Sequence, residues 1–438
     1  MVAMLAAPFP AGGTMAEAAG RVVEVVSCHD CGLVHRLAPM ADRTTAYCSR
    51  CGAALQRHVH ATVDRALGCY LGALILFQVA NLYPIMTFTL EGRAQSATIA
   101  GGARALWEAG SWPTALAVLL AGTVLPLLKI LANLYVLLPL RLGQRPPGLA
   151  LAFRWAERLG PWAMMEVYLL GLIVAYVKLD DTGSVGLGVA LYAFGALVLA
   201  VLAADTNLDR RAVWALVAPQ AGPELLRPRP GTELVSCHAC RQLARKEREG
   251  ASPACPRCGA ALHRRKPEGQ ARATALVLTA AILYLPANIY PVMTVTSLGQ
   301  GEPDTIVSGI RRLLEEGMVP IALLVLFASV LVPLLKLLGL ASLLVSVRRR
   351  SSWRPRDRTL LYRVIEGIGR WSMVDIFMIA ILTSLVSMGN IALVEPEVGS
   401  IAFAAVVILT MLAAMSFDPR LIWDVIDERH GDGRAPGA

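Results

Sequence analysis

The sequence predicts a mainly α-helical, polytopic membrane protein built from two tandem repeats. Each repeat is expected to contain a small β ribbon with four cysteines, followed by a bundle of four transmembrane helices. Three observations give this prediction: eight long apolar runs, a duplicated set of motifs, and two groups of four cysteines. The 438-residue chain is 55% hydrophobic and only 17% charged, whereas a soluble domain usually has about a quarter charged residues. That excess of apolar surface indicates a lipid environment.

Eight apolar runs are long enough to cross a hydrocarbon core of roughly 30 Å as helices. They lie near residues 66–89, 113–140, 161–179, 185–204, 272–296, 319–347, 371–390 and 398–416. We therefore expect about eight transmembrane helices.

Positive charge alternates between the connections that join these runs. The chain has a formal net charge of +9, which by itself could suggest a nucleic-acid partner. However, arginines such as Arg348, Arg349 and Arg350 crowd alternate connections, while the others carry acidic residues such as Asp180 and Glu315. By the positive-inside rule, both termini and both cysteine groups are expected in the cytoplasm. We expect no nucleic-acid partner.

The motifs recur at a nearly constant offset of 207 to 209 residues. The segment Cys28-His29-Asp30-Cys31 returns as Cys237-His238-Ala239-Cys240, and Pro126-Leu127-Leu128-Lys129 returns as Pro333-Leu334-Leu335-Lys336. An even number of crossings per repeat gives both halves the same orientation, so an axis along the membrane normal should relate them. The expected segments are an unstructured N-terminus 1–23, ribbon 24–60, bundle 61–215, linker 216–232, ribbon 233–266, bundle 267–424 and tail 425–438.

Eight of the nine cysteines form two Cys-x2-Cys pairs in each repeat. They are Cys28, Cys31, Cys48 and Cys51 in the first repeat, and Cys237, Cys240, Cys255 and Cys258 in the second. This spacing is typical of a zinc ribbon with tetrahedral thiolate ligands. Four thiolates leave no open position, so two structural Zn2+ sites are expected. Disulfides are the alternative, disfavoured in a reducing cytoplasm, and a rubredoxin-like iron site uses the same four ligands.

Charged residues inside the apolar runs are costly in a membrane and are therefore candidate functional residues. Lys129 and Lys336 follow Pro-Leu-Leu in the second and sixth runs, and Glu166 and Asp375 each follow a tryptophan by four residues. In the functional interpretation they line a polar cleft, bind a head group or relay protons. In the alternative they form structural ion pairs or extend toward the interface. Ser384 belongs to a seventh run that is more polar than its counterpart, which favours the second half.

The ends of the first and fifth runs carry a shared helix-end motif. It consists of Asn81, Tyr83 and Pro84 in the first repeat and of Asn288, Tyr290 and Pro291 in the second. Because proline removes a donor and clashes with the preceding turn, the motif is expected to end each helix. It marks either a shaped mouth on the periplasmic side or a simple helix stop.

The sequence lacks a Walker-type phosphate loop, a nucleophile elbow and a His-Glu-x-x-His motif, each of which would indicate an enzyme. We therefore expect a protein that is not an enzyme, and whose work in the membrane draws energy from a gradient or a partner.

Taken together, the duplicated motifs and the terminal Ser416-Phe417-Asp418-Pro419-Arg420 resemble the paraquat-inducible protein A family, over roughly residues 24–428. The resemblance implies a bacterial inner-membrane protein that works with a periplasmic mammalian-cell-entry (MCE) domain protein, which forms a tunnel for phospholipids between the two membranes. It also implies polar intramembrane positions at Lys129, Glu166, Lys336, Ser372, Asp375 and Ser384. The first repeat departs from the pattern at Ala163, where the second has Ser372.

Three functions follow as hypotheses. The leading one is an inner-membrane subunit of an intermembrane phospholipid transport system, which passes lipid to or from the MCE-protein tunnel. The alternative is a zinc- or redox-responsive membrane sensor or scaffold, in which the ribbons recruit a cytoplasmic partner. A membrane oxidoreductase would need iron in the ribbons or haem between the helices.

Overall fold

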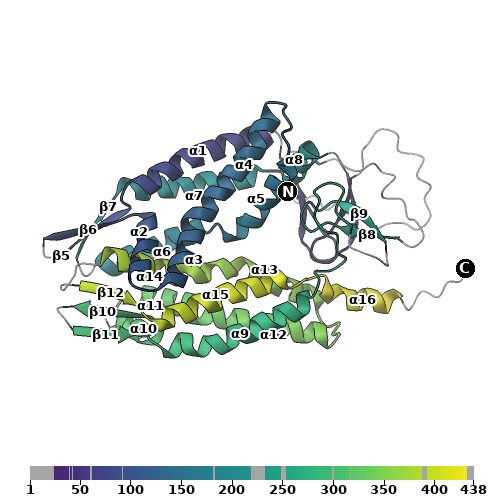
Figure 1. Ribbon diagram of the computed structural model, residues 1–438. Coiled ribbons are helices and arrows are strands. Elements are labelled where there is room, and N and C mark those ends of the chain that lie inside the picture. Colours follow the sequence, from purple (N-terminus) through teal and green to yellow (C-terminus); the bar gives the residue numbers. More distant parts are fainter. Residues whose placement is uncertain are drawn as a thin grey trace, which may run out of the picture.

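The computed structural model describes residues 24–38, 40–41, 43–59, 62–90, 92–180, 183–218, 232–247, 253–297, 300–315, 317–386 and 392–431. Two helical bundles lie side by side, and each is formed for the most part by one repeat (Figure 1). The expected unstructured N-terminus 1–23, most of the expected linker 216–232 and residues 432–438 of the expected tail lie outside the described residues. The expected segment boundaries stay predictions.

Eight helical stretches in the described part of the chain are long and apolar enough to cross a membrane, which confirms the predicted multi-pass architecture. Three are single helices: α1 (Thr62–Leu82), α7 (Val189–Asn207) and α9 (Gly269–Ile289). The other five spans each join shorter segments. In the first repeat, the second span consists of α3 (Trp112–Leu119), η1 (Leu120–Val124) and α4 (Leu125–Arg141), and the third of α5 (Leu149–Leu159), η2 (Gly160–Trp162) and α6 (Met165–Asp180). In the second repeat, the second span consists of α11 (Val319–Val325), η4 (Leu326–Leu331) and α12 (Val332–Arg348), the third of α13 (Pro355–Ile368), η5 (Gly369–Met373) and α14 (Val374–Leu385), and the fourth of α15 (Val398–Ser416) and α16 (Leu421–Gly431).

Several apolar runs are longer than the helices they contain. The runs at 66–89 and 272–296 continue past helices that end at Leu82 and Ile289, and the run at 185–204 begins before α7. The extra residues are strands, because Pro84 and Pro291 stop the helices and a threonine-rich, β-branched sequence follows each proline. The sequence prediction placed strands only in the ribbons, and that was incomplete.

These additional strands form two small antiparallel sheets at one end of the molecule. In the first repeat β5 (Met86–Leu90) lies between β6 (Arg93–Ala97) and β7 (Ser184–Leu187), and in the second β10 (Met293–Ser297) lies between β11 (Gln300–Asp304) and β12 (Ala392–Pro396). Each sheet is followed by a short amphipathic helix, α2 (Ile99–Glu108) or α10 (Ile306–Glu315). We call this the sheet end; the ribbons lie at the opposite, ribbon end (Figure 1).

Each repeat contains a π-helical turn in its second span. These turns, η1 and η4, immediately precede helices with a proline in the first turn, Pro126 and Pro333. A proline cannot donate the usual backbone hydrogen bond, and a π-turn accommodates the resulting gap. An irregular turn therefore precedes both Lys129 and Lys336.

The two bundles meet along α14, of which every residue is buried. This helix packs against α6 and α2 of the first repeat. The approach is close because small residues line it: a Cβ added at Gly171 would lie 3.0 Å from the Phe377 Cβ, and one at Gly102 would lie 3.1 Å from the Ala380 oxygen. Small residues of this kind allow helices to associate tightly in lipid. The aromatic rings of Tyr168 and Phe377 lie 5.0 Å apart across the same contact.

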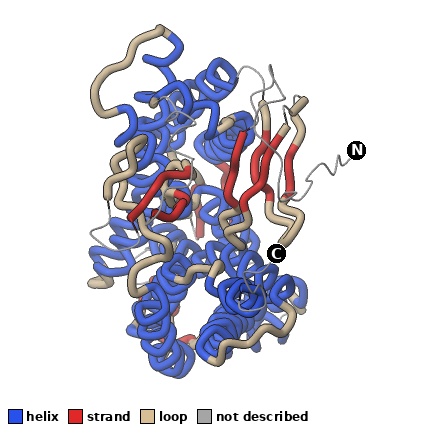
Figure 2. Tube along the Cα trace, turned by 90° about the vertical axis from the view of Figure 1, so that its right-hand side faces the viewer, coloured by secondary structure: helices blue, strands red, loops and turns tan. Residues whose placement is uncertain are grey.

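Each ribbon consists of short antiparallel strand pairs. The first ribbon pairs β1 (Glu24–Ser27) with β2 (Val34–Leu37) and β3 (Thr45–Tyr47) with β4 (Ala54–Arg57); the second pairs β8 (Thr232–Ser236) with β9 (Leu243–Glu247) and has a bridge between Ala254 and Ala261. Figure 2, which views the molecule from the ribbon end, shows strands over the ends of the helices.

The ribbons are exchanged between the bundles. The buried cysteines of the first ribbon belong to one apolar cluster with Tyr362 of α13 and Trp423 of α16, in the second repeat. The cysteines of the second ribbon belong to a cluster with Phe153 of α5 and with Trp214 of α8 (Arg210–Val217), in the first repeat. Each ribbon therefore packs against the bundle of the other repeat.

Candidate functional site

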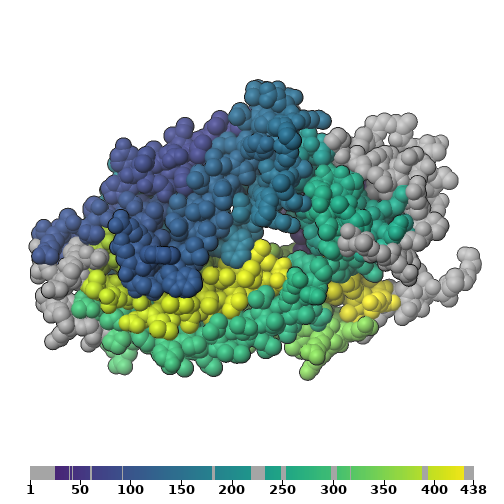
Figure 3. Space-filling view, in the orientation of Figure 1, coloured from purple at the N-terminus to yellow at the C-terminus, as the bar shows by residue number. Residues whose placement is uncertain are grey.

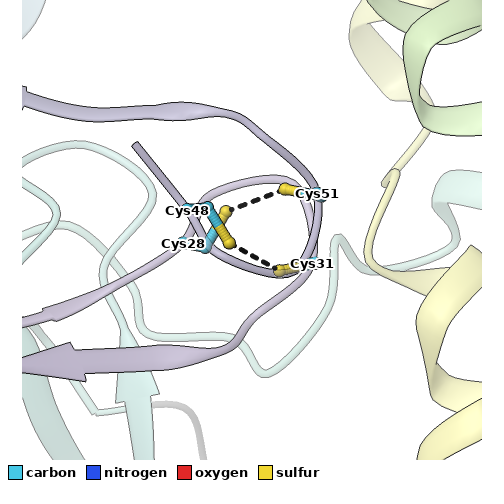
Figure 4. A group of neighbouring side chains, drawn as sticks. All are labelled: Cys28, Cys31, Cys48 and Cys51. Carbon is cyan, nitrogen blue, oxygen red and sulfur yellow. Dashed lines mark hydrogen bonds between the residues drawn. The ribbon is translucent and has the colours of Figure 1, made fainter. Parts of the chain in front are cut away.

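The four cysteines of the first ribbon point toward one another (Figure 4). Their sulfur atoms pair at 3.5 Å, Cys28 with Cys51 and Cys31 with Cys48. In the second ribbon the pairs are Cys237 with Cys258 at 3.5 Å and Cys240 with Cys255 at 3.6 Å. In each group the ligand atoms all lie within 4.8 Å of one another. Zn–S bonds of about 2.3 Å in a tetrahedron would place sulfur atoms roughly 3.8 Å apart. The donor set fits a tetrahedral metal ion.

Tight turns hold these ligands in place. Gly32, Gly52 and Gly259 have positive φ angles of 76°, 71° and 68°, a conformation that glycine adopts without steric cost. The backbone amides of Gly32 and Gly52 donate to the carbonyl oxygens of Cys28 and Cys48, at 3.0 and 2.9 Å. All nine cysteines are free. The predicted grouping of the cysteines is confirmed, and the alternative of disulfides is wrong.

Histidines flank both clusters. The Nε2 atom of His35 lies 3.2 Å from the sulfur of Cys48, a contact that the sequence did not reveal because His35 stands outside the cysteine pairs. In the second ribbon, Arg420 Nη2 lies 2.8 Å from Nε2 of His238. Desolvation lowers the pKa of His238 to about 4, so the ring is neutral near pH 7 and accepts this hydrogen bond.

The two intramembrane lysines have different partners. Lys129 donates to Asp205 of α7 with an Nζ–Oδ2 distance of 2.5 Å, and Tyr70 donates to the other oxygen of that carboxylate at 2.7 Å. Lys336 is 2% exposed, and among the described residues it donates to the Gly369 carbonyl oxygen, at 3.2 Å. At the position equivalent to Asp205 the second repeat has Ala414. Lys129 is thus neutralised by a carboxylate, whereas Lys336 meets a carbonyl group.

Glu166 joins the two bundles. Arg370 of the second repeat donates to its carboxylate at 3.2 Å. Glu166 lies near the middle of the span Leu149–Leu179, because α5 extends this span well before the apolar run that the sequence singled out.

Among the described residues, the second repeat has several buried polar atoms without a hydrogen-bond partner, and three of them lie in or beside the helices around α14. These three are Ser329 Oγ in η4, Ser372 Oγ in η5 and Asp375 Oδ2 in α14. Ser372 and Asp375 were predicted, whereas Ser329 was missed, because an isolated serine in an apolar run gives no signal. The first repeat has Gly122 and Ala163 at the positions of the two serines. A buried polar group without a partner costs about 1–3 kcal/mol, so this cluster is suited to receive a polar ligand or water.

Ser384 lies elsewhere on α14. It packs at the start of α2, where a Cβ added at Gly101 would lie 3.4 Å from its Oγ. Its neighbour Thr383 donates to the Ile379 carbonyl of its own helix at 2.8 Å. The structure therefore separates Ser384 from the cluster of Ser329, Ser372 and Asp375.

The helix-end motif joins helix to sheet. Asn81 and Asn288 donate to carbonyl oxygens four residues earlier in their own helices, at 2.9 and 2.8 Å. Tyr83 and Tyr290 are 53% and 54% exposed. Pro291 accepts a hydrogen bond from Gly399 at 3.0 Å, and a Cβ at Gly188 would overlap the Pro84 carbonyl oxygen. The motif thus contacts the start of the fourth span of its repeat, α7 or α15.

A cavity of about 880 Å3 lies between the bundles in the half of the molecule near the ribbons. The space-filling view shows the molecule hollowed there, between helices of the first repeat and α15 (Figure 3). Charged residues from both repeats line it: Lys129, Glu157, Glu166, Asp205, Arg210, Lys266, Lys336, Arg363, Glu366 and Arg370. Apolar side chains from α7 and α15 line it as well, among them Val201, Leu202, Met411 and Met415.

A second, much smaller space lies on the other side of η4. It has a volume of about 60 Å3 and is lined by Ser329 and Asp375, together with Lys178 and Asp304 toward the sheet end. Such a volume holds no more than a few water molecules. The large cavity thus has more than ten times the volume of the space beside Asp375.

Fold and site together define a class: a duplicated multi-pass membrane protein with two four-cysteine ribbons and a polar cavity between its bundles. The family model described as paraquat-inducible protein A matches residues 63–218 and 270–427. The chain belongs to the paraquat-inducible protein A family, as the sequence motifs predicted.

Curated relatives match along almost their whole length. The Escherichia coli protein named intermembrane transport protein PqiA is 33% identical over 409 residues, which cover 91% of this chain and 95% of that protein. The Escherichia coli protein named lipophilic envelope-spanning tunnel protein A is 31% identical, over 93% of this chain and 92% of its own. A Haemophilus influenzae protein named probable intermembrane transport protein is 26% identical, over 92% and 97%. No solved structure matches the chain.

Proposed function

We propose that this protein is a bacterial inner-membrane subunit of an intermembrane phospholipid transport system. The observation that carries the proposal is the cavity of about 880 Å3 between the two bundles, with charged and apolar walls. The names of the relatives, which refer to intermembrane transport and to an envelope-spanning tunnel, support the same function.

The lining of the cavity suits a phospholipid. A phosphate group needs a cation that is not already neutralised, and Lys336 donates to a carbonyl oxygen where Lys129 has a carboxylate. Charge-assisted hydrogen bonds of this kind are roughly twice as strong as neutral ones. Met411 and Met415 of α15 offer flexible apolar surface for acyl chains. Lys336 would hold the phosphate, while the chains lie against α7 and α15.

A route toward the sheet end runs along the second repeat. Lys336 lines the large cavity and Ser329 lines the small space, and both lie on the span that contains η4 and Pro333. π-turns are frequent at functional sites, and the irregular turn gives this span a place to bend. We infer that bending there opens the space beside Ser329, Ser372 and Asp375 to the lipid head group.

The distribution of charge supports an orientation with both termini and both ribbons in the cytoplasm. The sheet end then faces the periplasm. There it would deliver lipid to an MCE-domain tunnel protein or accept lipid from it.

The metal in each ribbon is proposed to be Zn2+, held by Cys28, Cys31, Cys48 and Cys51 in the first ribbon and by Cys237, Cys240, Cys255 and Cys258 in the second. Four thiolates occupy every position of a tetrahedral ion, so the ion would stabilise the ribbon without taking part in a reaction. We propose that the protein is not an enzyme.

Site-specific photo-crosslinking tests whether the cavity holds lipid. A photoreactive phenylalanine derivative replaces Met415, which lines the cavity, or Leu199, which is 67% exposed and serves as the control on the outer surface of α7. Both variants are purified in detergent, washed to remove loosely bound lipid, irradiated and analysed by mass spectrometry. We expect a phospholipid adduct at position 415 and little at 199. Equal adducts at the two positions would reject the cavity as the lipid site and favour a sensor or scaffold.

A further inference from the structure

Each ribbon is held by an arginine that belongs to the other repeat. Arg363 of α13 donates to the Cys51 carbonyl oxygen of the first ribbon at 3.1 Å and to the sulfur of Cys51 at 3.3 Å. Arg154 of α5 donates to the Cys258 carbonyl oxygen of the second ribbon at 3.3 Å. Arg154 and Arg363 are equivalent residues of the repeat, as are Cys51 and Cys258. The exchange therefore obeys the internal symmetry of the chain.

A second pair of arginines repeats the pattern from the ribbon side. Arg50 of the first ribbon lies 4.5 Å from the ring centroid of Trp423 in the second repeat, and Arg257 of the second ribbon lies 6.0 Å from that of Trp214 in the first. Cation–π contacts of this length are attractive. The two docking surfaces thus use the same residue types in the same arrangement.

Each ribbon is also tied to its own bundle. Where the first ribbon joins α1, Thr62 donates to the Asn207 carbonyl oxygen at 2.7 Å. After the second ribbon, Lys266 donates to the Phe417 carbonyl oxygen at 2.8 Å, and its backbone amide donates to Asp418 at 3.2 Å. Because each ribbon contacts both bundles, the pair forms two crossed connections at the ribbon end.

These connections border the cavity. Arg363, which holds the first ribbon, also lines the cavity, as does Lys266, which anchors the second. A change in the docking of either ribbon therefore acts on side chains in the cavity wall.

The two docking surfaces differ at one position of the cysteine turns. Asp30, 4% exposed, receives a hydrogen bond from Arg363 Nε at 2.6 Å. The equivalent residue of the second ribbon is Ala239, so Arg154 has no carboxylate in that knuckle. Arg50 also forms an ion pair with Asp427 of α16, whereas the equivalent Arg257 donates to the Ala218 carbonyl oxygen.

We infer that the two ribbons are crossed braces, each carried by one repeat and docked on the bundle of the other, and that metal loading draws the ribbon ends of the bundles together beside the cavity. The tight turn from Cys48 to Cys51 presents the Cys51 carbonyl oxygen to Arg363. This turn has its shape when the four thiolates share a metal ion, since small metal ribbons fold only with their metal. Loss of the ion then removes the docking surface, and the bundles separate at that end.

Distances between spin labels test this in the full chain. Labels on noncanonical residues, which spare the cysteines, replace Leu142 and Trp353 at the ribbon end, 63% and 69% exposed, or Leu82 and Ile289 at the sheet end, 75% and 68% exposed. Zinc-loaded protein in nanodiscs is compared with protein stripped by a chelator. We expect the ribbon-end distance to lengthen or broaden on stripping while the sheet-end distance stays fixed. No change, or the same change at both ends, would overturn the inference.

Metal release tests the exchange itself. Arg363→Ala should speed zinc release from the first ribbon by about tenfold, the effect of losing hydrogen bonds from a charged donor. Arg154→Ala should speed zinc release from the second ribbon. In a chain whose first ribbon carries Cys48→Ser and Cys51→Ser, Arg363→Ala should leave the release of the remaining zinc unchanged. Arg363→Gln, the milder variant, should act in the same direction. Faster release from the second ribbon in either Arg363 variant would contradict the exchange.

Discussion

One carboxylate distinguishes the two intramembrane lysines. Both follow the same Pro-Leu-Leu motif, yet Lys129 meets Asp205 and Tyr70 while Lys336 meets a backbone carbonyl group. A cation already paired with a carboxylate has a low affinity for a phosphate, because the phosphate would have to displace the carboxylate. The first repeat therefore neutralises its lysine, and the proposed phosphate site is at the lysine of the second repeat.

Ala414→Asp should transfer the arrangement of the first repeat to the second. The new carboxylate would stand at the position equivalent to Asp205 and neutralise Lys336. We expect phospholipid crosslinking at position 415 to fall by about tenfold or more, since a hydrogen bond from a charged group is lost. The measurement is the adduct yield in the photo-crosslinking assay.

Ala414→Asn is the matched control, because it adds nearly the same volume without the charge. It should retain most of the adduct. If the two variants lose lipid equally, the effect is one of packing, and Lys336 has no role in binding the phosphate.

At the scale of elements, the joint between helix and sheet depends on two glycines. Gly188 immediately precedes α7 and Gly399 is the second residue of α15, and a Cβ at either would overlap the carbonyl oxygen of Pro84 or Pro291. The helix-end motif and these glycines thus form one unit, in which the chain that leaves the first helix contacts the chain that enters the fourth.

Gly188→Ala should destabilise the protein by about 1–3 kcal/mol, the usual cost of overpacking, because backbone atoms on both sides must move. Unfolding by denaturant in mixed micelles gives the free energy. Gly195→Ala, in the same helix with no atom within 4 Å of the new Cβ, should be neutral or stabilising by up to about 1 kcal/mol. If Gly188→Ala has the same free energy of unfolding as the native chain, the backbone around Pro84 and Gly188 can move at little cost.

Elements with a periodic or repeated signal could be predicted from the sequence. The eight spans follow from long apolar runs and the two four-cysteine sites from cysteine spacing. The two sheets could not, because strands such as Met86–Leu90 continue an apolar run without a break in composition. The partner of Lys129 was hidden for a related reason: Asp205 stands near the end of the fourth run, 76 residues away, where a carboxylate is unremarkable.

At the scale of the whole molecule, the exchange of ribbons was beyond sequence reasoning. Arg154 and Arg363 are equivalent residues of the two repeats, and so are the cysteines that they contact, Cys51 and Cys258. Because of this equivalence, either ribbon has the groups to dock on either bundle. Only the path of the chain in space decides between the two arrangements. The predicted duplication is correct, but the two repeats are interlocked at the ribbon end rather than independent.

The two internal spaces lie at different levels along the molecule. The large cavity lies in the half near the ribbons, and the space beside Asp375, toward the sheet end, has less than a tenth of its volume. Under the proposed transport function, the small space has to widen before lipid passes from the large cavity to the sheet end.

Reconstituted lipid transfer tests whether this protein passes phospholipid to an MCE-domain protein. Vesicles that contain a labelled phospholipid and this protein, oriented with the sheet end outward, are mixed with a soluble MCE-domain protein, and label on that protein is counted after separation. We predict that label reaches the MCE protein from vesicles with the native chain and falls toward the protein-free level with Ala414→Asp. Transfer no faster than from protein-free vesicles, with both proteins folded and bound, would contradict the account.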